Sequence, residues 1–417
     1  MKIELDMYQT LAVAVLVLML GKFLRARVQV LERFCIPAPV IGGVLFAIFT
    51  CVCYGTGIAE FAFDDLLKEV CMVFFFTSVG FQANLKVLKS GGKSLILFLG
   101  LVVALILCQN FLAVGLADLL GISPMIGLCT GSIPMVGGHG TSGSFGPVLE
   151  SVGLDNATTI AFAAATFGLV SGSLLGGPMG EFLVRHYGLT SVADEERLDP
   201  ANTSDELQKL EQAAHGERKA IDEEKRAGQS INNYRFMNAL AHLLIAMGLG
   251  TVVSQIFVNF GLVFPNYIGS MLVAAIIRNV SDYTHAYKVY QRESEVLGNL
   301  GLTIFLSCAL MSLKLWQLSD LAIPLMAMLL SQVLFIALFV KFLLFRVMGR
   351  NYEAAVMAAG TCGFGLGATP NAIANMSVMV ERFGPAPTAF FVIPLIGALI
   401  VDFVNSSIVT VLLNLLA

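Results

Sequence analysis

Charged side chains are scarce in this chain. Only 13% of its 417 residues are Asp, Glu, Lys or Arg, whereas 57% are hydrophobic and the mean hydropathy is +0.81. A soluble protein of this length needs far more charged surface, so the composition excludes an ordinary soluble globular protein. It indicates instead a protein that crosses a membrane many times.

Paired cysteines and metal-binding spacings are also missing. All of the eight cysteines except Cys35 lie within or beside apolar segments, and none forms a Cys-x-x-Cys pair. This usage is typical of small buried hydrophobic residues rather than of disulfides or metal ligands. We therefore expect no cofactor, and nothing in the charge pattern indicates a nucleic-acid partner.

Apolar stretches long enough to cross a bilayer as helices, about 20 residues each, recur along the chain. They predict an all-α polytopic membrane protein with ten transmembrane helices, five in each half. The expected domains are an N-terminal repeat over 1–184, a charged cytoplasmic linker over 185–235 and a C-terminal repeat over 236–417. The predicted spans are 7–24, 36–54, 66–82, 94–117, 157–184, 236–260, 264–281, 296–313, 320–345 and 386–415.

The placement of Lys and Arg predicts the orientation. With the N-terminus outside, 22 of the 25 basic residues fall in inside connections, and only Lys2, Lys68 and Lys314 remain outside. This asymmetry follows the positive-inside rule, so both termini are expected outside, in the periplasm. Because five spans per half is an odd number, the second half should be inverted relative to the first.

A constant offset of 228 residues relates the two halves. It places Pro37 on Pro265, Leu85-Lys86 on Leu313-Lys314, Gly121 on Gly349, Thr141 on Thr369, and Ala161-Phe162 on Ala389-Phe390. Five separated landmarks with one offset indicate an internal repeat.

Each repeat contains a Gly-rich break in apolar sequence. The first break lies in 121–153 and the second in 349–384. Neither segment has arms long enough to cross a bilayer alone, and non-helical backbone at membrane depth must be buried in protein or line a cavity. We therefore predict two re-entrant hairpins that enter from opposite sides and meet near the midplane.

Paired interruptions of this kind indicate a transporter's binding site. Glycine exposes backbone groups at close range, a helix start attracts anions, and freed carbonyls coordinate Na⁺. Packing of helices is the alternative role for the glycines, and it is the role expected for Gly168, Gly172 and Gly176. The predicted substrate-binding residues are Gly137, Gly138, His139, Gly140, Thr141, Ser142, Gly365, Gly367, Thr369 and Asn371.

Two titratable residues stand out in apolar surroundings, one in the first break and one in the last predicted span. His139 is either a ligand of a substrate carboxylate or a brace of the first loop, and we weigh these equally. Asp402 lies inside the last apolar segment, where a carboxylate is costly without a function, and Asn405 shares its helical face. Together with Thr369 they form the predicted Na⁺ site, although a structural role for a hydrogen-bonded acid remains the alternative.

An enzymatic interpretation is also open. Gly140-Thr141-Ser142-Gly143 matches the short GxSG motif of rhomboid-type intramembrane serine proteases, and His242 lies on a later span. A Ser142/His242 dyad would leave the second Gly-rich loop and the repeat unexplained. We therefore do not expect an enzyme.

The residues resemble the bacterial sodium/glutamate symporter family over nearly the whole chain outside 185–235. The resemblance rests above all on Cys362-Gly363-Phe364-Gly365-Leu366-Gly367-Ala368-Thr369-Pro370, on Ala372-Ile373-Ala374-Asn375-Met376 and on Glu381-Arg382-Phe383-Gly384-Pro385. It implies secondary active, Na⁺-coupled uptake of L-glutamate by alternating access across the bacterial inner membrane. It also implies Na⁺ as coupling ion, contact with membrane lipid and a homodimer. A di- or tricarboxylate is the alternative substrate.

Overall fold

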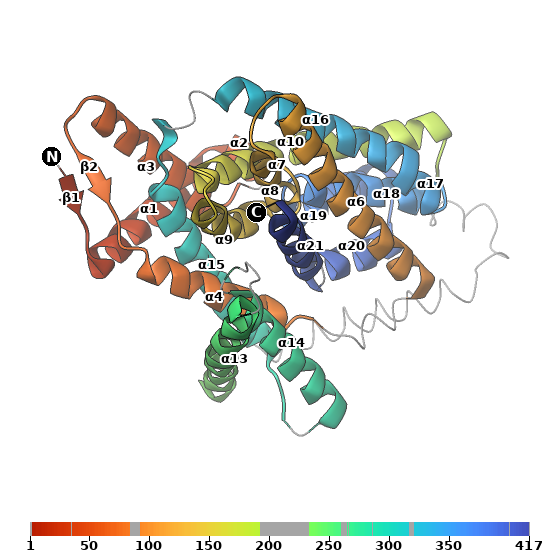
Figure 1. Cartoon of the computed structure of the whole chain (residues 1–417). Helices are drawn as coiled ribbons and strands as arrows, with labels where there is room; N and C mark the ends of the chain where they lie inside the picture. The colour runs from red at the N-terminus through yellow and green to blue at the C-terminus, as the bar shows by residue number, and fades with distance from the viewer. Residues whose placement is uncertain are drawn as a thin grey trace.

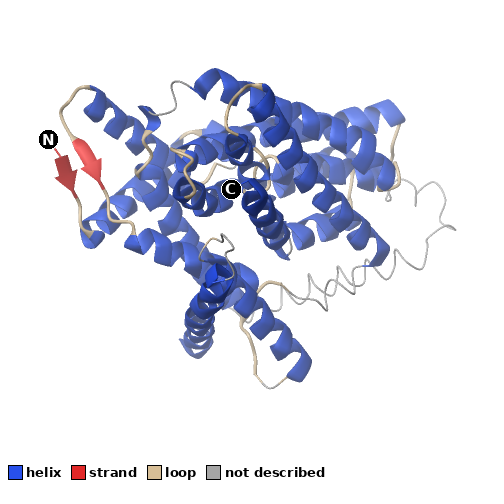
Figure 2. Cartoon of the chain, in the orientation of Figure 1, coloured by secondary structure: helices blue, strands red, loops and turns tan. Residues whose placement is uncertain are grey.

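The computed structural model describes residues 2–34, 36–83, 92–191, 233–259, 265, 267–285, 287–316, 321–399 and 401–416. Most of the predicted linker and the landmark Leu85-Lys86 lie outside these residues. Within them the structure is helical apart from turns, loops and one pair of short parallel strands, β1 (Lys2–Glu4) and β2 (Glu60–Ala62) (Figure 2). The strands were not predicted from the sequence.

The described helices of the first half run from Met7 to Tyr187. They are α1 (Met7–Arg27), α2 (Gln29–Arg33), α3 (Ala38–Gly55), α4 (Leu66–Gly80), α6 (Gly92–Leu119), α7 (Pro124–Thr130), α8 (Ser132–Met135), α9 (Gly138–Ser151) and α10 (Ala157–Tyr187).

The described helices of the second half run from Asn233 to Leu416. They are α13 (Asn233–Asn259), α14 (Tyr267–Thr284), α15 (Gln291–Met311), α16 (Ala322–Leu338), a π-helical turn (Phe339–Leu344), α17 (Phe345–Val347), α18 (Tyr352–Gly365), α19 (Thr369–Phe383), α20 (Pro387–Leu399) and α21 (Val401–Leu416).

Long apolar helices confirm a multi-pass membrane protein. Among the described residues, 7 helices are long and apolar enough to cross a bilayer, and the bent pair α20 and α21, with 46° between them, would make up to 8. The predicted span 66–82 corresponds to α4, which has only 15 residues, and 264–281 corresponds to α14, which carries Arg278 and Asp282. Ten spans therefore stay a prediction.

Helix boundaries follow the offset of 228 residues. It separates Pro124, the first residue of α7, from Tyr352, the first residue of α18. Gly121 (φ 69°) and Gly349 (φ 108°), which precede these two helices, share a left-handed backbone that disfavours any residue with a Cβ atom. These two pairs of positions take similar local structure, whereas the starts of α9 and α19, Gly138 and Thr369, are 231 residues apart.

Helices of both halves pack together in two groups (Figure 1). The first group contains α1, α3, α4, α13, α14 and α15. The second contains α6 to α10 and α16 to α21. Phe145 of α9, Phe162 of α10 and Phe305 of α15 share one buried apolar cluster, so the groups touch through side chains around α9.

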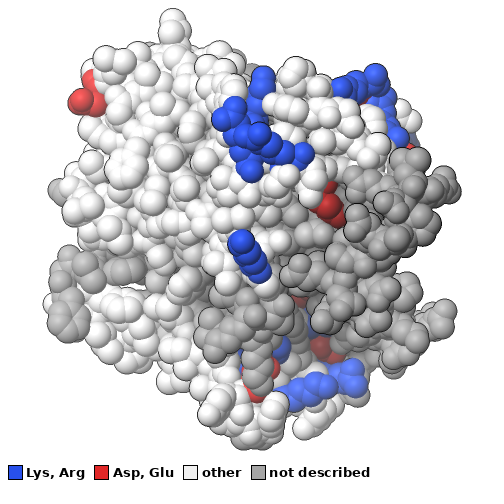
Figure 3. Space-filling view, turned by 90° about the vertical axis from the view of Figure 1, so that its right-hand side faces the viewer, with Lys and Arg blue, Asp and Glu red and all other residues white. Residues whose placement is uncertain are grey.

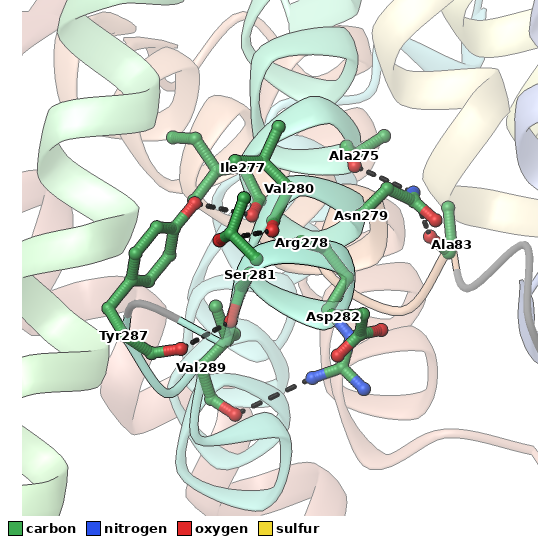
Figure 4. A network of polar contacts seen from close by, with 11 residues as sticks. Ala83, Ala275, Ile277, Arg278, Asn279, Val280, Ser281, Asp282, Tyr287 and Val289 are labelled. Carbon is green, nitrogen blue, oxygen red and sulfur yellow. Dashed lines mark hydrogen bonds and ion pairs between the residues drawn. The ribbon is translucent and has the colours of Figure 1, made fainter.

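A polar network closes the end of α14 in the first group (Figure 4). Arg278 forms an ion pair with Asp282 at 3.1 Å, and Asn279 donates to the carbonyl of Ala83 at 2.8 Å. The Tyr287 hydroxyl donates to the carbonyl of Ile277 at 2.7 Å. The network joins α14 to the residues after α4 and to the connection before α15.

Candidate functional site

The first Gly-rich segment forms a broken helical hairpin. Pro124 starts α7, where its missing N–H and fixed φ suit the first helical turn. The backbone departs from helix at Gly131 (φ −83°, ψ −142°), passes through the short α8 and reverses before α9. At the reversal Gly138 has φ 58°.

The second Gly-rich segment forms a second hairpin. The Asn351 side chain caps α18 by accepting from the N–H of Ala354 at 2.9 Å, and every residue of α18 is buried. The chain then leaves the helix over 366–368, and α19 begins at Thr369 with Pro370 in its first turn. With 14 residues in α18 and 15 in α19, each arm is shorter than the roughly 20 residues that span a bilayer.

The tips of the two hairpins touch. A Cβ atom placed on Gly138 would lie only 2.7 Å from the carbonyl oxygen of Gly367, so a side chain there would push the tips apart. A Cβ atom on Gly137 would collide with the Thr141 side chain and lie 2.8 Å from Nδ2 of Asn405. The structure thus brings together five of the residues that the sequence predicted.

Ser132 and Asn110, which the sequence analysis did not select, tie the first tip to α21 and α6. The Ser132 hydroxyl donates to Oδ1 of Asn405 at 2.6 Å, and Nδ2 of Asn405 donates to the Ser132 carbonyl at 3.2 Å. Asn110 donates through Nδ2 to the Ser132 hydroxyl at 2.7 Å and accepts from the Ser132 N–H at 3.1 Å. All three side chains are fully buried.

Helix α10 packs against both hairpins. Nε2 of His139 lies 3.0 Å from the Thr166 hydroxyl, and Nδ2 of Asn371 donates to the Leu169 carbonyl at 2.9 Å. The His139 ring therefore contacts α10. Gly168 and Gly172 let α10 approach the backbone carbonyls of Leu366 and Cys362, which is the packing role expected for them.

Gln109 and Gln332 hold the second tip and were also missed. Nε2 of Gln109 donates to the Gly365 carbonyl at 2.8 Å, and Nε2 of Gln332 donates to the Gln109 carbonyl at 3.0 Å. Uncharged amides inside apolar helices are costly unless bonded or functional, and this signal could have found both.

Several buried oxygens near the tips have no hydrogen-bond partner among the described residues. They are Oγ1 of Thr141 in α9, Oε1 of Gln109 in α6 and Oδ1 of Asn371 in α19. Such atoms cost about 1–3 kcal/mol each when left unpaired. Neutral oxygen ligands suit Na⁺ or a substrate ammonium group, so the tips have the chemistry of a small-ligand site.

The remaining predicted residues lie around this site. A Cβ atom placed on Gly140 would lie 3.5 Å from the ring of Phe75 in α4. The Ser142 hydroxyl donates to the Gly138 carbonyl at 2.7 Å. The Thr369 hydroxyl lies 2.8 Å from a Cβ position on Gly397 of α20. Asp402 is partly exposed at the start of α21.

The proposed protease dyad finds no support in these contacts. Ser142 is buried and bonded within its own helix, while Nδ1 of His242 in α13 lies 2.7 Å from the Asn238 carbonyl and its ring stacks on Tyr287. The two residues belong to different helix groups.

Comparison with known proteins assigns the family. The family model of the sodium/glutamate symporters matches residues 3–385. The chain belongs to this family. A sodium/glutamate symporter of Escherichia coli strain K12 is 39% identical over 414 residues, covering 99% of this chain and 98% of that protein. One of Haemophilus influenzae strain Rd is 38% identical over 414 residues, covering 98% of each. The family consists of transporters, so the chain is a transporter and not an enzyme.

Proposed function

We propose that this protein is a secondary active transporter that couples the entry of Na⁺ to the uptake of L-glutamate. The main observation in support of the proposal is the contact between Gly138 and the Gly367 carbonyl. This contact joins the two hairpin tips, and buried oxygens without hydrogen-bond partners lie near them. Both relatives above are named sodium/glutamate symporters. The names of these relatives favour L-glutamate over a di- or tricarboxylate as the transported substrate.

Uptake of labelled glutamate into proteoliposomes tests this function. An inward Na⁺ gradient should drive accumulation, whereas a K⁺ gradient or a proton gradient alone should not. Uptake that ignores Na⁺ refutes the coupling, and competition by unlabelled malate or citrate as strong as by glutamate refutes the substrate. Gly138→Val and Gly365→Val should each lose uptake while the protein still inserts into the membrane.

We infer that the fold contains two inverted five-span repeats, each with one re-entrant hairpin. The inference is supported by the shared start of α7 and α18 under the offset and by hairpin arms too short to cross a bilayer. The repeats supply helices to both groups. Alternating access then consists of a movement of the second group, which carries both tips, against the first.

The proposed setting is the bacterial inner membrane, with both termini outside and a homodimer as the assembly. The charge asymmetry of the sequence supports the orientation. On the side of the molecule that bears α17, basic side chains form a few patches and a few acidic side chains are also visible among the described residues (Figure 3). Labelling of single cysteines introduced at Lys2 and Arg346 with an impermeant reagent tests the orientation, and only the first should react from outside.

The Na⁺ ligands are proposed to include Asn405, Thr369 and Asp402 together with carbonyls of the tips. Asn405 contacts the first tip, and Thr369 begins the helix after the second. Gly137, Gly138, Gly140, Gly365 and Gly367 would then shape the substrate site, with His139, Thr141, Ser142 and Asn371 at its walls.

A further inference from the structure

A cavity of about 1030 Å³ lies between the two helix groups. One wall is α9, through residues including Gly143 and Ser144, and it continues into the start of α10. The facing wall consists of β2, α4 and the end of α15. Its size lies at the upper limit of small-molecule sites, about 1,000 Å³. We call this space the vestibule.

The vestibule collects all the basic residues that the charge pattern places outside. Lys2, Lys68 and Lys314 all line it. They come from the N-terminal strand, from α4 and from the residues after α15. Elements from both halves thus bring all three lysines that the charge pattern places outside to one cavity. Lysines that only extended their side chains to the membrane surface would be distributed around the molecule instead.

The three lysines differ in availability. Lys68 forms an ion pair with Asp65 at 2.7 Å, and Lys2 forms one with Glu4 at 2.8 Å. Lys314 is exposed and has no ion pair within the part of the chain that the structure describes. A cation free to bind an anion therefore stands at the rim of the cavity.

The acidic lining sets the character of the site. The carboxylates outnumber the lysines, so an anion would be held weakly and released readily, as an entry site requires. They also suit a ligand that carries an ammonium group beside its carboxylates. The lining carboxylates are Glu60, Asp65, Glu69, Glu150 and Asp155.

The vestibule leads toward the hairpin tips. Gly143 lines it and lies about one and a half turns of α9 beyond Gly138, whose backbone touches the second tip. At this place the rings of Phe305, which also lines the cavity, and Phe162 pack directly against Gly143. The vestibule thus borders the helix whose first residue, Gly138, forms part of the first tip.

We propose that the vestibule is an entry site for an acidic amino acid, in which Lys314, assisted by Lys68, binds the substrate's carboxylates before they reach the tips. The proposal rests on the proposed function, because it assumes that this substrate is transported. It predicts that the lysines govern capture and not the transport step.

The experiment compares initial rates of Na⁺-driven glutamate uptake in proteoliposomes. Lys314→Gln should raise KM roughly two- to five-fold, the range expected for one exposed ion pair, with the maximal rate retained. Lys314→Arg should restore the KM. Asp65→Asn should lower KM, because it removes the ion pair that engages Lys68. The Asp65 side chain makes no capping hydrogen bond to α4, so the substitution does not remove a helix cap.

Ionic strength provides a second readout. At constant Na⁺, added choline chloride should reduce the difference in KM between the wild type and Lys314→Gln, because salt screens the attraction of Lys314 for the substrate. Lys93→Gln at the start of α6, an exposed lysine outside the vestibule, is the matched control and should leave KM unchanged.

The outcomes separate the two proposals. If the wild type shows no Na⁺-driven glutamate uptake, the proposed function fails. If the wild type transports but Lys314→Gln keeps the wild-type KM, or lowers only the maximal rate, the entry site is wrong. An unchanged or raised KM in Asp65→Asn also contradicts it.

Discussion

The contact between the two hairpin tips yields the sharpest prediction, the effect of Gly138→Ala. Gly138 has φ 58°, and its Cβ position lies 2.7 Å from the Gly367 carbonyl oxygen. Alanine in the left-handed region costs about 1–2 kcal/mol, which lowers the ratio of native to displaced tip conformations by roughly 5- to 30-fold. The collision with the Gly367 carbonyl oxygen adds to this cost and shifts the ratio further, so uptake should fall well below that of the wild type.

Gly188→Ala is the matched control. Gly188 has φ 61°, nearly the same backbone as Gly138, but among the described residues nothing beyond its chain neighbours and the backbone of its own helix lies within 4 Å of its Cβ position. The control therefore carries the same backbone strain at the end of α10 without the contact between tips. It should lower thermal stability to a similar degree and retain most of the uptake.

The assay combines two measurements on each variant. Initial rates of Na⁺-driven glutamate uptake are normalised to the reconstituted protein, and unfolding midpoints are measured in detergent. Equal uptake by Gly138→Ala and Gly188→Ala would show that strain alone matters. The contact between the tips would then have no role in transport.

Three further substitutions test other parts of the structure. Gln109→Leu removes the donor to the Gly365 carbonyl and should lower stability by about 1–3 kcal/mol and reduce uptake; unaltered unfolding and uptake would contradict this. Asp402→Asn should raise the Na⁺ concentration for half-maximal uptake, and an unchanged Na⁺ dependence removes Asp402 from the cation site. Arg278→Met leaves the largely buried Asp282 without its 3.1 Å ion pair and should lower the unfolding midpoint by the equivalent of about 1–3 kcal/mol, whereas an unchanged midpoint shows that the pair is dispensable.

The sequence was sufficient to predict where the described helices and both Gly-rich breaks lie. Bilayer thickness imposes a common length on spans, and glycine and proline mark their ends, so the information is local. The predicted span 157–184 is close to α10, and the break in 349–384 falls between α18 and α19. The last span, 386–415, differs because the structure divides it into α20 and α21.

The lateral packing of helices was beyond the sequence. A helix in lipid is apolar on every side, so no amphipathic stripe marks the face that meets another helix. In α6, Gln109 and Asn110 are fully buried, while Phe111 next to them is 63% exposed. The polar contact of Ser132 with Asn405 joins residues 273 positions apart, and only the fold reveals it.

The kinds of contact made by glycine indicate where the proposed movement occurs. Gly168 and Gly172 of α10 meet the backbone carbonyls of Leu366 and Cys362, and backbone cannot yield without unfolding a hairpin. The three atoms nearest to a Cβ position on Gly140 of α9 are ends of side chains of the first group, from Phe75, Phe76 and Leu302, at 3.5, 3.8 and 3.9 Å. Side-chain ends shift at low cost, so the surface of α9 against α4 and α15 is the one able to slide. The two hairpins and α10 would then move as one unit, which keeps the tips in contact while the site changes its access.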